Sequence, residues 1–167
     1  MISFESVTQT VEKISAMTIE QTQTLANQMS EEQPYILVYL LAASENEAFT
    51  DDESELFFFV GSVLWQVMRQ NPNGKRQISE KNILNATKVN ESLLKKMATD
   101  SEGDFFSVSE KIVLNSPEPE VLRYITDSLM EEDDEILDKP SFRDDKLGVA
   151  FLHLKIVLDA FISRRKI

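Results

Sequence analysis

Hydrophobic residues recur along this chain at helical spacing, and one strongly apolar segment lies near its middle. Residues 50–68 begin with an acidic first turn, in which Thr50 and Glu53 have the spacing of a capping box. After that turn the segment is apolar on every side, which is typical of either a membrane span or the centre of a protein. Its apolar part, residues 56–68, is shorter than the roughly 20 residues that a bilayer needs. The pattern therefore predicts a central buried helix.

A second strongly apolar helix is predicted near the C-terminus, from about residue 144 to 163. It contains Phe151, Leu154, Leu158 and Phe161. We expect it to pack against the central helix, so that the remaining segments gather around this pair.

Shorter helices are indicated by periodicity and by capping residues. Spacings of three and four residues give the N-terminal segment a narrow apolar face, made of Phe4, Val7, Val11 and Ile14. Helix starts are predicted at three further capping boxes (Thr18 with Gln21, Ser30 with Gln33, Ser107 with Glu110), at Pro34, at Ser79 and at Ser116-Pro117. The helix that starts at Ser79 is predicted to be long, with Ile83, Ala86, Leu93 and Met97 on its inner face.

A turn cluster at residues 71–74, Asn-Pro-Asn-Gly, divides the chain nearly in half. Residues 34–40 resemble residues 119–125 at an offset of 85, and residues 57–68 resemble residues 151–162 at an offset of 94. This correspondence is consistent with a duplication into two four-helix halves, at 1–70 and 79–167, and equally with a chance match between apolar helices.

No segment alternates with period two for long enough to indicate a sheet. The sequence therefore predicts an all-α fold: a single compact helical domain over residues 1–167, of about eight helices, with two central apolar helices. The length of 167 residues is enough for a substantial core without disulfides or metals.

Charge is unevenly spread over this chain of net charge −12. Residues 1–68 hold 11 acids and a single base, Lys13, whereas residues 69–96 hold 7 bases and 2 acids. An acidic surface keeps a protein soluble and can also steer a basic partner toward it. With no cysteine and no signal-peptide pattern at the N-terminus, we expect a cytoplasmic protein.

Residue types that carry catalysis are scarce. The sole histidine, His153, lies in the apolar C-terminal helix and is expected to be a core or groove-lining residue rather than a base. The four glycines are isolated, so no phosphate-binding loop is indicated, and the acidic clusters lack the ligand spacing of a calcium loop. We therefore predict no catalytic, cofactor-binding or metal site.

The leading hypothesis is a non-enzymatic interaction protein, such as an adaptor, an inhibitor or an immunity-type protein, that binds a basic protein partner through acidic residues. The residues expected to contact the partner are Glu45, Glu47, Asp51, Asp52, Glu131, Glu132, Asp133 and Asp134. The apolar surplus of residues 57–60 also suggests self-association into a homo-oligomer.

Two alternatives remain open. Lys81, Lys88 and Lys95 repeat every seven residues and would share one helix face, as in a nucleic-acid-associated regulator, although the acidic balance of the chain disfavours nucleic acid. This basic stretch could equally be a solvated face or pair with the acidic region 1–68. The second alternative is a helical domain that binds an apolar small molecule near Trp65.

Overall fold

The computed structural model describes residues 1–97, 102–130 and 142–163. Within these ranges the secondary structure is helical and contains no strand, which confirms the predicted all-α fold. Nine α-helices occur in the described ranges, where about eight were predicted. They are α1 (Phe4–Ser15), α2 (Ile19–Glu32), α3 (Pro34–Asn46), α4 (Asp51–Arg69), α5 (Glu80–Val89), α6 (Glu91–Met97), α7 (Glu102–Leu114), α8 (Pro119–Met130) and α9 (Leu147–Ser163), with short 3-10 turns η1 (Pro72–Lys75) and η2 (Asp144–Lys146).

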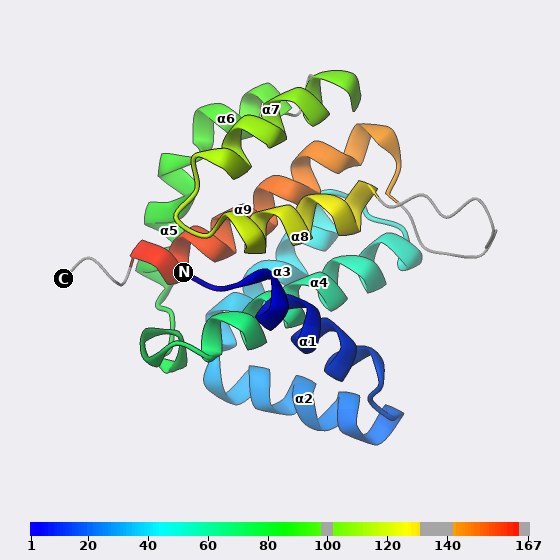
Figure 1. Ribbon diagram of the computed structural model, residues 1–167. Helices are drawn as coiled ribbons and strands as arrows, with labels where there is room; N and C mark the ends of the chain where they lie inside the picture. The colour runs from blue at the N-terminus through cyan, green and yellow to red at the C-terminus, as the bar shows by residue number, and fades with distance from the viewer. Residues whose placement is uncertain (98–101, 131–141, 164–167) are drawn as a thin grey trace.

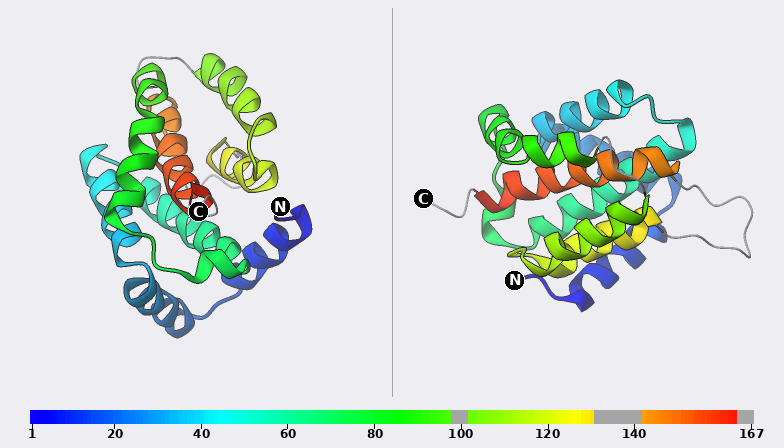
Figure 2. Two further views of the ribbon diagram at one scale, coloured as in Figure 1. Left: turned by 90° about the vertical axis from the view of Figure 1, so that its left-hand side faces the viewer. Right: turned by 90° about the horizontal axis from the view of Figure 1, so that it is seen from above.

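The predicted central helix and the predicted C-terminal apolar helix form the centre of the molecule, as expected. Helix α4 packs against α9, and the other helices surround this pair (Figures 1 and 2). Phe57 of α4 and Phe151 of α9 are completely buried. A Cβ on Gly61 would lie 2.9 Å from a methyl carbon of Leu40 and 3.9 Å from one of Leu154, so α3, α4 and α9 meet at this glycine. The predicted wrapping of smaller helices around two apolar helices is therefore correct.

Several predicted helix starts are confirmed. The capping boxes of Thr18 and Thr50 are both formed, Ser79 caps α5 and Pro34 is the first residue of α3. At each of these positions a side-chain cap or a proline coincides with the beginning of an apolar periodic segment, so the two signals predict the same helix start.

Three predicted starts are wrong. Ser30 lies inside α2 and Ser107 inside α7, and α8 begins at Pro119 rather than after Ser116. Gln33, the expected partner of Ser30, instead accepts a hydrogen bond from the Ile78 amide (2.8 Å). A capping motif therefore does not always mark a helix start, because a serine is tolerated inside a helix that is stabilised by packing.

The long helix predicted after Ser79 is also wrong, because the chain leaves helical geometry at Asn90 and forms α5 and α6. The buried Asn90 side chain donates to the Ala86 carbonyl (2.8 Å) and to the Asp159 carboxylate (2.8 Å), and accepts from Lys155 Nζ (2.7 Å). Asparagine is disfavoured in helix interiors because its side chain competes for backbone hydrogen bonds. This cluster joins the break to α9.

Helix α9 begins at Leu147, three residues after the predicted start, and η2 precedes it. Pro34 and Pro119 each open a helix, as the proposed duplication requires. The duplication itself stays a prediction. In the described part of the chain, no helix combines the length and the apolar character needed to cross a bilayer.

Candidate functional site

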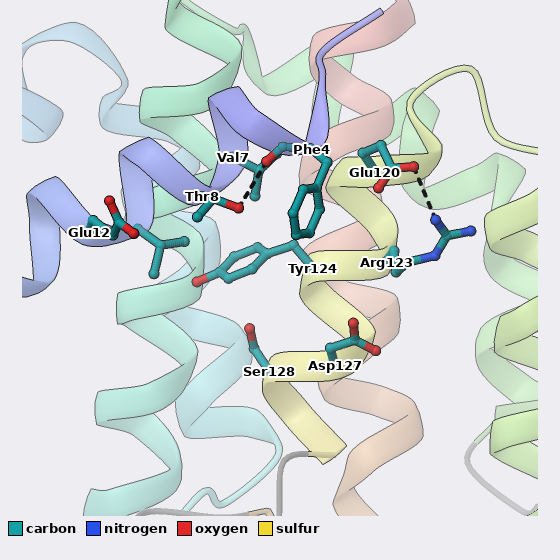
Figure 3. Close-up of a pocket in the computed structure, with 10 residues that line it drawn as sticks. Phe4, Val7, Thr8, Glu12, Glu120, Arg123, Tyr124, Asp127 and Ser128 are labelled. Carbon is teal, nitrogen blue, oxygen red and sulfur yellow. Dashed lines mark hydrogen bonds and ion pairs between the residues drawn. The ribbon is translucent and has the colours of Figure 1, made fainter.

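A groove of about 410 Å³ lies between α1 and α8 (Figure 3). Its apolar surface comes from the side chains of Phe4, Val7, Val11 and Tyr124. Phe4 is 69% exposed, so this ring contributes a large apolar surface at the edge of the groove. The rings of Phe4 and Tyr124 both project into the space between the two helices (Figure 3). A groove of this size and lining is suited to an apolar side chain of a binding partner.

The start of the chain fixes the position of Phe4. Ile2 is buried, and its amide donates a 2.8 Å hydrogen bond to the carboxylate of the fully buried Glu118, just before α8. Ser3 caps α1 by accepting from the Ser6 amide (3.1 Å). These contacts join the first turn of α1 to the start of α8, so Phe4 is held beside α8.

The rim of the groove is acidic. Glu12 comes from α1, and Glu120, Arg123 and Asp127 come from α8. Arg123 pairs with Glu120 at 3.0 Å, so these two charges largely cancel. The exposed Glu12 then adds a negative charge to the α1 side of the rim. An apolar floor with an acidic rim favours a ligand that carries an apolar group beside basic groups.

The acids predicted to bind a partner do not form one cluster in the described structure. Glu45 is exposed near the end of α3, and Asp51 and Asp52 are exposed in the first turn of α4. Glu47 is half-buried and contacts His153. Glu131, Glu132, Asp133 and Asp134 lie outside the described residues. Their role in partner binding stays a prediction.

The three lysines of the nucleic-acid alternative are exposed, but they do not share one continuous helix. Lys81 and Lys88 belong to α5, whereas Lys95 belongs to α6, beyond the break at Asn90. At another position in the basic stretch, Arg69 pairs with Glu32 at 2.9 Å, as expected if this stretch pairs with the acidic first segment.

His153 connects α3 with α9. Tyr39 Oη lies 2.7 Å from His153 Nδ1, and His153 Nε2 lies 3.1 Å from a carboxylate oxygen of Glu47. The chain is complete if the tyrosine donates to Nδ1 and the neutral imidazole donates from Nε2 to the carboxylate. Burial, with the nearby Glu47 charge, raises the pKa of Tyr39, so its hydroxyl stays protonated. The arrangement joins α3 to α9, and the expectation that His153 is a core or groove-lining residue rather than a base stays a prediction.

Replacing Tyr39 by Phe should lower the free energy of unfolding by about 1 kcal/mol, since it removes one hydrogen bond from a half-buried pair. Tyr35→Phe is the matched control, because Tyr35 lies on the same helix and is 42% exposed. Urea denaturation of both variants measures the difference. Equal stabilities would show that the Tyr39–His153 contact does not stabilise the fold.

Trp65, the centre of the apolar-ligand alternative, is 1% exposed and packed in the core. Its indole Nε1 has no hydrogen-bond acceptor among the described residues. Phe57 and Val60 are buried, while Phe58 and Phe59 are half-buried and pack against the core. Much of the apolar surface at residues 57–60, which had suggested self-association, is therefore covered by other parts of the same chain.

Comparisons with protein-family models, with curated proteins and with solved structures give no significant match to this chain. The candidate site therefore rests on its own geometry. The sequence did not indicate this site, because Phe4 and Val11 belong to the predicted apolar face of the first helix. Tyr124 lies within residues 119–125, which entered the sequence analysis only through the internal repeat.

Proposed function

We propose that this protein is a non-enzymatic interaction domain that binds a basic segment of a protein partner in the groove between α1 and α8. The bound segment carries an apolar side chain next to lysine or arginine. The observation that carries this proposal is the exposed Phe4 ring beside an acidic rim. An exposed aromatic side chain at the edge of a groove can become buried on binding, and aromatic residues are enriched among those that dominate binding energy.

Charge supports the same partner class. The chain has a net charge of −12, so a basic partner is attracted over distances beyond the groove itself. Glu45, Asp51 and Asp52 are exposed and add to this attraction without lining the groove. Binding should therefore weaken as the salt concentration rises.

Photo-crosslinking in the native host tests this proposal. A benzoylphenylalanine at position 4 should crosslink to a partner peptide that contains an apolar residue flanked by Lys or Arg. The same group at position 19 is the matched control, since Ile19 is 80% exposed but lies at the start of α2, outside the groove. Identical crosslinked products from the two positions, or an acidic crosslinked peptide, would contradict the proposal.

With the captured peptide in hand, we expect Phe4→Ser to weaken its binding by about tenfold, through loss of a buried aromatic contact. Ile19→Ser should change the affinity by less than about twofold, because single exposed apolar residues contribute little away from an interface. Fluorescence anisotropy of the labelled peptide measures both affinities. Thermal unfolding of the two variants checks that each remains folded.

A further inference from the structure

A second cavity, of about 310 Å³, lies on a different face of α1 and differs from the groove in charge. It is bounded by α1, the end of α4 and η1. Its lining comprises Thr10, Lys13, Ile14, Met17, Gln66, Arg69, Gln70 and Lys75. Three of these side chains are cationic and none is acidic, although the whole chain has a net charge of −12.

The positive charges come from distant parts of the sequence. Lys13 is the single base of residues 1–68, and the fold brings it to the same cavity as Arg69 and Lys75. Arg69 is paired with Glu32 at 2.9 Å. Neither lysine ammonium forms an ion pair in the described part of the chain. The cavity therefore has two cations whose charge a carboxylate does not balance, in addition to the Arg69–Glu32 pair.

Polar groups beside this cavity lack hydrogen-bond partners. The amide nitrogen of Gln66 and the Nε of Arg69 are both buried, and neither has an acceptor among the described residues. Buried donors without acceptors cost free energy unless a ligand or water supplies one. An anionic oxygen bound in the cavity would supply an acceptor to either donor once its side chain turned toward the cavity, whereas Arg69 Nε could also turn to Glu32 Oε2, which is buried without a donor. Nearby, the Gln70 amide donates to the Thr10 hydroxyl at 2.8 Å, which links the end of α4 to α1.

We infer that this cavity binds a small organic phosphate, with the phosphate group between Lys13, Lys75 and the Gln66–Arg69 wall. A phosphate monoester carries close to two negative charges at neutral pH, which matches the two lysines that lack carboxylate partners. Ile14 and Met17 provide an apolar surface for the organic part of the ligand. The volume lies at the lower end of the range for small-molecule sites.

This site is separate from the proposed partner groove, since the two cavities have no lining residue in common. Phosphate binding should therefore be the same in Phe4→Ser as in the unchanged protein.

The test is a titration of the full chain with phenyl phosphate, followed by ¹⁵N-resolved NMR at constant ionic strength. Saturable shifts are expected at the Gln66 side-chain amide and at the backbone amides of residues 74 and 75. The double variant Lys13→Gln/Lys75→Gln should weaken binding by about tenfold or more. The matched control is Lys81→Gln/Lys88→Gln, which removes two exposed lysines of α5 outside the cavity and should change the affinity by less than about twofold.

Three outcomes would overturn the inference. The first is a titration without saturation, or with shifts spread evenly over the surface lysines. The second is an equal loss of affinity in the two double variants. The third is that benzoate, which has the same ring but a single negative charge, binds as tightly as phenyl phosphate.

Discussion

Glu53→Gln should lower the free energy of unfolding at neutral pH by about 2–3 kcal/mol, because a buried, fully hydrogen-bonded carboxylate loses its charge. Glu53 is 1% exposed. One carboxylate oxygen accepts from the Thr50 amide (2.8 Å), which completes the capping box of α4, and the other accepts from the Arg143 amide (2.8 Å). The Arg143 guanidinium adds a charged hydrogen bond from Nη2 at 2.9 Å. Glu53 therefore fixes the start of α4 against the segment that leads into α9.

The pH dependence of this effect has a definite sign. Burial favours the protonated form of Glu53, but hydrogen bonds from the Arg143 side chain and backbone and from the Thr50 backbone outweigh it, so the pKa falls below the ordinary value of 4.5. A carboxyl whose pKa is lower in the folded state stabilises the protein above its unfolded pKa, and this stabilisation is lost as the pH falls through the folded pKa. The stability difference between the unchanged protein and Glu53→Gln should therefore be constant near neutral pH and shrink in acid.

Urea denaturation at neutral pH and at about pH 3 measures both effects. Glu55→Gln is the matched control, because Glu55 is exposed and lies two residues after Glu53 on the same helix. This substitution should change the free energy of unfolding by less than about 0.5 kcal/mol. A Glu53→Gln penalty of the same size at both pH values would show that the ionised carboxylate is not its source.

The sequence predicted the capping half of this arrangement but not its tertiary half. Thr50 and Glu53 are three residues apart, and a local spacing is sufficient to define a capping box. Arg143 is 90 residues away from Glu53 and follows a different segment, so no local pattern connects the two. The central pair of helices was predictable for the same reason as the cap, since strong apolar composition over a whole helix determines burial without knowledge of the neighbours.

The candidate sites depend on contacts between residues that are far apart in the sequence. Spacing placed Phe4 on the apolar face of α1, but it could not show that this face extends beyond the core to the edge of a groove with α8. Likewise, Lys13 and Lys75 are separated by 62 positions and meet only through the packing of α1 against α4 and η1. The prediction that the lysines repeated every seven residues share one face required an unbroken helix. The helix is interrupted at Asn90, whose side chain bonds to α9.

Gly74→Ala should lower the free energy of unfolding by about 3 kcal/mol, whereas Gly61→Ala should change it by less than about 1 kcal/mol. Neither glycine has a positive φ, so close approach rather than backbone conformation distinguishes them. A Cβ at Gly74 would lie 1.6 Å from the carbonyl oxygen of Met68, which is backbone and can move only with the end of α4. That carbonyl also accepts from the Asn71 amide at 3.2 Å, so its displacement would open the turn between α4 and η1.

At Gly61 the clash is with a side chain that can move, and the higher helix propensity of alanine offsets its cost. The Cβ would meet a Leu40 methyl carbon at 2.9 Å, which a side-chain rotation can relieve in part, and alanine is favoured over glycine inside a helix by about 1 kcal/mol. The pair thus compares a backbone clash in a turn with a side-chain clash in a helix. Thermal and urea unfolding of both variants measure the difference, and equal destabilisation would show that the backbone clash at Gly74 costs no more than the side-chain clash at Gly61. Because Lys75 follows Gly74 directly, the same displacement should also weaken phenyl phosphate binding in Gly74→Ala and leave it unchanged in Gly61→Ala.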